Sequence, residues 1–284
     1  MPLVSIVVTT KNESQNIVAC LESVCQQTFQ DHEIIVVDNA STDDTKDLAR
    51  RYTDKVLDHG PERSAQRNFG VAQADGTYIL YLDADMILEP GVVAECVAIC
   101  EANARITGVY IPERIVGDGF WIKVRAFERS FYNGTVIDAV RFVPKQIFQD
   151  VDGFDVSMCG PEDWDFDKKI RGLGLTVTCD SLVMHNEGHF DLSRYLAKKT
   201  YYAGSFETYV ARWGGDDPDV KRQLGPFYRF VGVFTEHGKY VWLLQHPLLS
   251  LGMYWLRFRV GLRYLRVKLA RGKAKHDAAC ASFR

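Results

Sequence analysis

The sequence predicts an α/β protein built on a doubly wound, mostly parallel sheet. Short apolar, β-branched runs such as "LVSIVVTT" (3–10) are typical of parallel strands covered on both faces. Strand-like and helix-like segments alternate three times before residue 105, as in doubly wound sheets. Polar residues follow several of these strands, and ligands of such sheets lie beyond the carboxyl ends of the strands. We therefore expect a site at that edge.

The first half of the chain supplies these elements in regular order. Helical spacing of apolar residues at Ile17, Cys20, Leu21 and Val24 predicts the first helix. The expected strands are 3–10, 32–41 and 76–85, and the expected helices are 13–28, 42–52, 63–74 and 91–103. The second helix gains acidic residues in its first turn, where the helix dipole favours them.

The pattern loosens after residue 105. We expect strands at 107–116, 139–148 and 175–185, a helix at 120–132, and a turn opening a helix within 160–174. From about residue 190 the sequence is helical and aromatic. This organisation predicts a domain over 1–190, with halves at 1–105 and 106–190, and a helical, basic C-terminal extension over 191–284.

Composition and charge exclude several classes of function. The net charge of −3 gives no reason to expect nucleic acid as a partner. The seven cysteines are scattered, which is typical of buried, reduced thiols in a cytosolic protein. We recognise no signal peptide and no apolar run long enough to span a membrane, so we expect a cytoplasmic protein.

The "YLDAD" segment ends a buried strand with two carboxylates. Asp83 and Asp85 are two residues apart, so in a strand they would share one face and repel each other. A hard divalent cation between them would remove this conflict, because Mg²⁺ or Mn²⁺ favours carboxylates together with substrate phosphates. The alternative is one helix-capping aspartate and one solvated aspartate.

Two later segments carry further candidates. Glu162 and Asp163 follow Gly160 and Pro161 at a turn, where a carboxylate can take a proton from a hydroxyl group. They could instead be structural acids of a helix N-terminus. His185 ends a strand-like run and could meet a metal or a phosphate, and His189 follows one helical turn later; either could also be an ordinary core or surface residue.

Together these segments resemble the family-2 glycosyltransferases of GT-A fold. The matching pieces, in order, are "VSIVVTTKNE", "EIIVVDNASTDDT", "RNFGVAQADGTYILYLDADM", "VDGFD" and "PEDWDFDKKIRGLG". The resemblance covers roughly residues 2–190. It implies an enzyme that moves a sugar from a nucleoside diphosphate to an acceptor with inversion.

The resemblance also implies roles for individual residues on the donor side. Thr9, Asn12 and Glu13 would line the nucleoside site, with Glu13 near the ribose. Asp38 would accept a hydrogen bond from the base, and Arg67 would lie near the donor. The base of the nucleotide stays open between UDP and GDP, because an aspartate can pair with an N–H of either.

The same resemblance places the catalytic and metal residues. Asp83 would meet the ribose or the sugar, and Asp85 would ligate the Mn²⁺ or Mg²⁺ that bridges the two phosphates. Asp163 would be the catalytic base with Glu162 beside it, and His185 would complete the metal or phosphate site.

The C-terminal segment suggests where the acceptor is met. Residues 257–275 hold eight basic and no acidic side chains, and apolar residues recur there with helical spacing at Phe258, Leu262, Leu265 and Leu269. A basic amphipathic helix of this kind suits an anionic membrane surface. We therefore expect a peripheral protein at the inner face of the cell membrane. The alternative is a helix packed on its own domain or at a dimer interface.

The function that follows is an inverting glycosyltransferase acting on a hydroxyl of a lipid-linked glycan intermediate or glycolipid. A polyprenyl-phosphate glycosyl synthase is the nearest rival, although an ionised phosphate acceptor needs no base and the "PED" segment favours the hydroxyl. A third reading is an inactive nucleotide-sugar-binding scaffold. A nucleotidyltransferase is a further candidate, but no Gly-rich, basic phosphate loop appears near the N-terminus.

Overall fold

A central sheet organises the molecule in the computed structural model, which describes the backbone of residues 1–281 and the side chains of residues 1–266. Across the sheet the strands are β3 (Val56–Asp58), β2 (His32–Asp38), β1 (Val4–Thr10), β4 (Tyr78–Asp83), β8 (Val140–Pro144), β6 (Ile106–Tyr110) and β9 (Leu175–Thr178). Strand β8 runs antiparallel to both neighbours, and the other pairs are parallel. The predicted mostly parallel α/β sheet is therefore confirmed.

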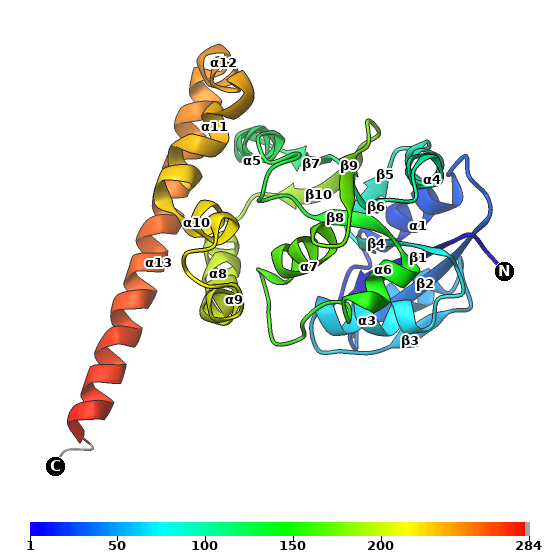
Figure 1. Cartoon of the computed structure of the whole chain (residues 1–284), viewed down its shortest axis with the longest axis horizontal. Helices are drawn as coiled ribbons and strands as arrows, with labels where there is room; N and C mark the ends of the chain where they lie inside the picture. The colour runs from blue at the N-terminus through cyan, green and yellow to red at the C-terminus, as the bar shows by residue number, and fades with distance from the viewer. Residues whose placement is uncertain (282–284) are drawn as a thin grey trace.

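Helices cover both faces of this sheet (Figure 1). On one face pack α1 (Ile17–Cys25), α2 (Thr45–Ala49) and α4 (Val92–Ala102), and on the other α3 (Arg63–Ala72), α6 (Lys145–Asp150) and α7 (Glu162–Arg171). Strand β1 explains the division, because Ile6 and Val8 enter the first core cluster and Val7 enters the second. Gly70 lets α3 lie close to the sheet, since a Cβ there would be 2.4 Å from Val7 Cγ1.

A smaller sheet extends the carboxyl end of β4. It consists of β5 (Met86–Leu88), β10 (Val183–His189) and β7 (Glu113–Asp118), with β10 in the middle. His185 pairs with Met86 across the antiparallel β5–β10 ladder, and with Ile115 across the parallel β10–β7 ladder. The small sheet therefore brings β10 next to the turn that carries Asp85.

Several predicted elements were wrong in their boundaries. The single strand expected at 107–116 is two strands, β6 and β7, in different sheets, and Pro112, which cannot donate to a ladder, lies between them. The segment 175–185 likewise divides into β9 and the start of β10. The strand expected at 139–148 ends at Pro144, after which the chain forms α6. The helix expected at 42–52 is only the short α2.

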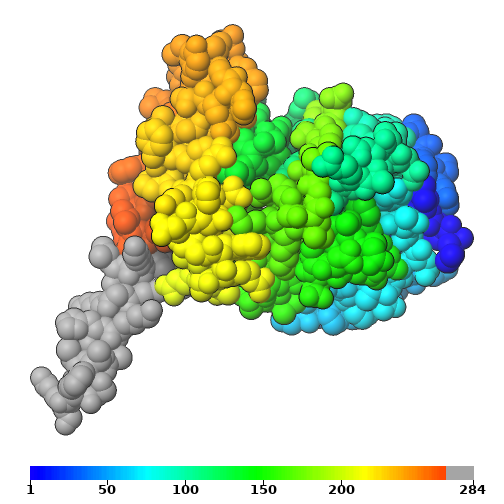
Figure 2. Space-filling view, viewed as in Figure 1, coloured from blue at the N-terminus to red at the C-terminus, as the bar shows by residue number. Residues whose placement is uncertain are grey.

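The chain after residue 190 is helical, as predicted. It forms α8 (Leu192–Tyr202), η1 (Ala203–Ser205), α9 (Phe206–Trp213), α10 (Pro218–Leu224), η2 (Tyr228–Gly232), α11 (Val233–Thr235), η3 (Glu236–Gly238), α12 (Tyr240–Gln245) and α13 (Pro247–Ala281). These helices form one flank of the molecule (Figures 1 and 2). Their main contact with the rest is α5 (Phe120–Ser130), where Val124 packs with Phe234, Met253 and Leu256. The predicted domain boundaries stay a prediction.

Two further expectations can be compared with the structure. Cys96 and Cys100 lie buried on the core face of α4, as their spacing predicts, and Cys20 and Cys179 are also buried. Among the described residues, none of the helices combines the length and the apolar character that a membrane crossing requires.

Candidate functional site

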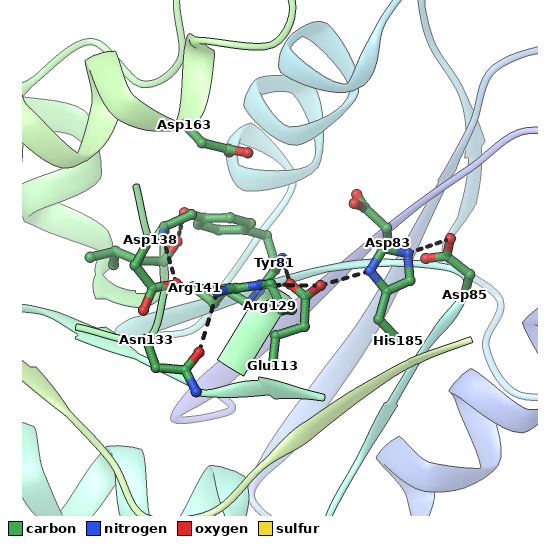
Figure 3. Close-up of polar contacts among 12 residues, drawn as sticks. Tyr81, Asp83, Asp85, Glu113, Arg129, Asn133, Asp138, Arg141, Asp163 and His185 are labelled. Carbon is green, nitrogen blue, oxygen red and sulfur yellow. Dashed lines mark hydrogen bonds and ion pairs between the residues drawn. The ribbon is translucent and has the colours of Figure 1, made fainter. Parts of the chain in front are cut away.

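The two aspartates of the "DAD" segment do not lie side by side on one strand. Strand β4 ends at Asp83, and Ala84 and Asp85 form a turn before β5 begins. The carboxylates consequently diverge (Figure 3). Each has its own cationic partners: Arg63 and Arg67 for Asp83, and His185 for Asp85. The expectation of one strand over 76–85, with both carboxylates on one face, is wrong, because β4 ends two residues before Asp85.

Asp83 is held by two arginines of α3 and by a threonine of β1. Arg67 Nη2 and Arg63 Nη1 each donate to it at 3.1 Å, and Thr9 Oγ1 donates at 3.0 Å. Burial alone would raise the pKa of Asp83, but the charges of Arg67 and Arg63 hold it well below its ordinary value. Asp83 is therefore ionised.

Asp85 faces a chain of alternating acids and bases that runs into the small sheet. His185 Nε2 lies 3.0 Å from Asp85 Oδ2, and His185 Nδ1 lies 2.9 Å from Glu113 Oε1 (Figure 3). Glu113 in turn pairs with Arg141 at 3.0 Å and with Arg129 at 3.5 Å. Burial would lower the pKa of His185, but the hydrogen bonds to Asp85 and Glu113 raise it to about 10. His189, by contrast, is exposed at the end of β10.

The Asp85–His185 pair fits a divalent metal. Asp85 Oδ1 is buried and has no hydrogen-bond partner in the described structure, which leaves one carboxylate oxygen free for a cation. A carboxylate that orients the far nitrogen of a ligating histidine is a common arrangement around metals, and Glu113 occupies that place. No group of three or more potential protein ligands gathers among the described residues, so phosphates and water would supply the other positions.

The start of α7 brings a second pair of carboxylates toward the same place. Asp163 Oδ1 accepts a 2.7 Å hydrogen bond from Arg67 Nη1, while Glu162 Oε1 accepts one from Arg63 Nη2 at 3.1 Å. The Asp163 side chain is 24% exposed and that of Glu162 only 2%. Burial, and after it the charge of Asp163, raises the pKa of Glu162. Asp163 is thus the acid of this pair that a substrate can reach.

The predicted nucleoside residues lie at the ends of β1 and β2. Glu13 accepts a 2.6 Å hydrogen bond from Asn16, and burial raises its pKa. Asn12 Oδ1 accepts from the Thr42 backbone at 2.8 Å, which joins the two strand-end loops.

Asp38 is the candidate that the structure leaves least accessible. It is fully buried, and its two carboxylate oxygens accept hydrogen bonds from the Ser41 backbone at 2.7 Å and the Ser41 hydroxyl at 2.5 Å. Contact with a nucleobase requires the turn at 38–41 to open.

Three residues of the site were not predicted from the sequence. Arg63 links Asp83 to Glu162, and its place four residues before Arg67, on the same helix face, was a usable signal. Glu113 orients His185, but a lone acid in an expected strand gave no such signal. Tyr202 of the extension accepts a 3.2 Å hydrogen bond from Arg63. It lies beyond the segment that carried the resemblance.

Comparisons with known proteins identify the family of the chain. Residues 5–158 match the family described as "Glycosyl transferase family 2". The chain is 27% identical over 207 residues to the chondroitin synthase of Escherichia coli, which covers 66% of this chain and 30% of that protein. It is 26% identical over 174 residues to a PGL/p-HBAD biosynthesis glycosyltransferase of Mycobacterium bovis, which covers 58% of this chain and 68% of that protein.

Solved structures show the same fold. The mannosyltransferase PcManGT of Pyrobaculum calidifontis, in complex with GDP-Man and Mn²⁺, superposes with a TM-score of 0.62 at 19% identity, over 95% of this chain and 86% of that one. S. aureus TarS in complex with UDP-GlcNAc gives a TM-score of 0.56 at 18% identity, over 81% of this chain and 73% of that one. The GT-A architecture expected from the resemblance is confirmed.

Proposed function

Because the chain belongs to glycosyltransferase family 2, we propose that it is an inverting glycosyltransferase. It moves a sugar from a nucleoside diphosphate to a hydroxyl group of an acceptor. One observation carries the proposal: a single buried arginine, Arg67, holds both Asp83 and Asp163 and so fixes the donor side against the partly exposed base.

The donor binds along the carboxyl ends of β1, β2 and β4. Thr9, Asn12 and Glu13 line the nucleoside, and Asp38 accepts from the base once its turn opens. PcManGT binds GDP-Man and TarS binds UDP-GlcNAc, so a UDP- or GDP-sugar is the donor class.

Asp85 and His185 would hold Mn²⁺ or Mg²⁺ together with the donor phosphates. The unpartnered oxygen of Asp85 and the orientation of His185 by Glu113 support this assignment. A cation bound there stabilises the negative charge of the departing nucleoside diphosphate. His185 would hold the cation as a neutral imidazole, with Glu113 as the partner of its other ring nitrogen.

Asp163 acts as the general base. It takes the proton of the acceptor hydroxyl as that oxygen attacks the anomeric carbon from the side opposite the leaving group, and the configuration therefore inverts. The Arg67 guanidinium keeps Asp163 in place, and Glu162 holds Arg63. Because a phosphate acceptor needs no base, the accessible position of Asp163 favours a hydroxyl acceptor over the polyprenyl-phosphate alternative.

The acceptor is a glycan intermediate or glycolipid held at an anionic membrane surface. Leu248, Leu251, Trp255, Phe258 and Leu265 form an exposed apolar stripe at helical spacing on α13. Arg259, Arg263 and Arg266 are exposed next to it. Arg257, counted with the basic tail from the sequence, instead lies buried against Glu128, and the side chain of Leu269 lies outside the described residues.

Thermal-shift titration with UDP and GDP, with and without Mn²⁺, tests the proposal first. A ligand that binds only the folded state raises the melting temperature. We expect a rise with one nucleotide that Mn²⁺ enlarges and that Asp85→Ala abolishes. No rise with either nucleotide would contradict the metal-bridged donor site. Sugar transfer that survives Asp163→Asn would favour a phosphate acceptor.

A further inference from the structure

A second cluster of charges lies where the extension packs on α5, apart from the residues assigned to sugar transfer. Glu128 forms its centre and accepts hydrogen bonds from Arg125 Nη1 at 2.7 Å, Arg257 Nη1 at 2.6 Å and Tyr132 Oη at 2.7 Å. Arg125 also donates to Glu187 at 3.0 Å. Both carboxylates of the cluster, Glu128 and Glu187, are therefore already paired with arginines.

Two more cations adjoin this cluster without a carboxylate of their own. Arg229 lies with its guanidinium carbon 5.7 Å from the centre of the Tyr132 ring. Its side chain makes no hydrogen bond or ion pair to the described residues, and its buried Nη1 has no partner. Lys199 makes no ion pair to them either and contacts the Tyr195 ring at 5.5 Å. Arg257, which is 6% exposed, leaves its buried Nε unpartnered.

The unpaired positive charges destabilise the fold when no ligand is bound. Burial, and with it the neighbouring charge of Arg125, lowers the pKa of Lys199 to about 7. Burial lowers the pKa of Arg229 as well, and the charge of Arg257 acts in the same direction. Buried donors and like charges without partners destabilise a fold, so their presence calls for a ligand that completes them.

We propose that Lys199, Arg229 and Arg257 form a binding site for a phosphate group. The phosphate is that of the lipid-linked acceptor, and this identification rests on the proposed function. The diphosphate linkage of a lipid-linked glycan, like a phosphate monoester, carries up to two negative charges, which match the two unpaired cations. Its oxygens accept from the free guanidinium N–H groups in the geometry that arginine favours. Lys199 and Arg229 are each partly exposed, so an anion can approach from solvent.

The surroundings favour a lipid phosphate over a free one. Phe227 and Val231 lie on either side of Arg229 in the chain and are 76% and 42% exposed. The exposed stripe of α13 begins at Leu248, and α13 also supplies Arg257. A phosphate bound to Arg229 therefore has apolar surface beside it for an attached hydrocarbon chain.

Thermal-shift and calorimetric titrations of the full chain test the site with three probes: inorganic phosphate, farnesyl phosphate and farnesol. Lys199→Gln and Arg229→Gln remove the unpaired cations without removing an ion pair of the described structure. Lys221→Gln is the matched control, because Lys221 is exposed on α10 and pairs only with the surface residue Asp216. UDP or GDP with Mn²⁺ is titrated into every variant.

We expect farnesyl phosphate to bind the wild type and the control, and to bind Lys199→Gln and Arg229→Gln more weakly by about tenfold or more. We also expect both site variants to melt at or above the wild-type temperature without ligand, because each removes an unfavourable charge. Binding of farnesyl phosphate alone assigns a lipid phosphate, and comparable binding of inorganic phosphate assigns the phosphate group itself.

Three results would overturn the proposal: no binding of either phosphate, equal binding by the site variants, or tighter binding of farnesol. A lower melting temperature of ligand-free Lys199→Gln would also count against it, because the lysine would then be structural. If the variants still bind the nucleotide, these results contradict only the phosphate site and leave the glycosyltransferase proposal standing.

Discussion

Arg67 and Asp163 form a 2.7 Å ion pair that joins the donor-side helix α3 to the first turn of α7. The guanidinium is 1% exposed and also pairs with Asp83, and it lies over the rings of Tyr81 and Phe154 at 4.8 and 5.0 Å. One planar group thus joins Asp83 at the end of β4 to Asp163 at the start of α7. Arg63 repeats the link one helical turn earlier, between Asp83 and Glu162.

Replacing Arg67 with lysine should therefore be damaging. Lysine keeps the charge but cannot contact both carboxylates in the plane of a guanidinium. We expect Arg67→Lys to lower the free energy of unfolding by about 3–5 kcal/mol, the range for breaking a buried pair. Urea unfolding measures this change. Arg50→Lys is the control, since Arg50 forms an exposed pair with Asp47 and its replacement should change little.

Replacing Asp163 and replacing Glu162 should change kcat by different amounts. Asp163→Asn removes the accessible base and should reduce kcat by about 10²–10⁴-fold, with little change in nucleotide binding. Glu162→Gln should act indirectly, through Arg63, and should reduce kcat less. Nucleoside diphosphate release under saturating donor gives kcat for both. A larger loss in Glu162→Gln would reassign the base.

The metal site should depend on Glu113 as well as on its ligands. Asp85→Ala should abolish the gain in nucleotide affinity that Mn²⁺ provides. Glu113→Gln should weaken Mn²⁺ binding by about 10–100-fold, the usual effect of losing a partner that orients a ligating histidine. Titration of Mn²⁺ into the nucleotide complex, followed by electron paramagnetic resonance, measures free metal directly. His189→Gln should bind Mn²⁺ normally.

The sequence predicted the parts of the site that follow directly from strand ends. Asp83 ends β4 and Asp85 follows it, and the parallel arrangement of the main sheet brings such ends together. His185, expected at the end of a strand, instead lies within β10 of the small sheet, where it pairs with Met86 across the antiparallel β5–β10 ladder. Short-range signals also located α7 and its acids. The GT-A fold itself needed the resemblance of several motifs at once, because each alone is weak.

What could not be predicted depends on contacts between distant segments. Glu113 reaches His185 only because Pro112 separates β6 from β7 and the chain enters the small sheet. Tyr202 reaches Arg63 across more than a hundred residues of sequence. The divergence of Asp83 and Asp85 depends on the point where β4 stops, and strand boundaries are weakly encoded in local sequence.

Acid should loosen the contact between α5 and the extension through Glu128. Burial raises its pKa, but the charges of Arg125 and Arg257 outweigh this and lower it to about 2 from an ordinary value near 4.5. A carboxyl with a depressed pKa stabilises the fold fully above its ordinary pKa and loses that stabilisation as pH falls toward 2. The loss amounts to about 3 kcal/mol. Urea unfolding at several pH values measures how the free energy of unfolding depends on pH. This dependence should be weaker in Glu128→Gln than in the wild type, and an equal dependence would assign the acid sensitivity to another group.

The exposed stripe of α13 should bind anionic membranes. Leu248 and Leu251 are 72% and 70% exposed, and changing both to glutamate adds charge where hydrocarbon contact is expected. We expect the double variant to bind vesicles containing phosphatidylglycerol more weakly by about tenfold or more.

Leu173→Glu is the control for that experiment, because Leu173 is a similarly exposed leucine, 53% accessible, in the turn that follows α7. Vesicle flotation measures binding, and salt should weaken it by screening Arg259, Arg263 and Arg266. The alternative occupant of the stripe is a second copy of the chain. Like charges from the same three arginines would then face each other in a parallel pairing of α13, which disfavours it. Sedimentation distinguishes the two occupants. If the wild type is a dimer, the double variant is a monomer and vesicle binding is unchanged, then the stripe binds a second copy of the chain and not a membrane.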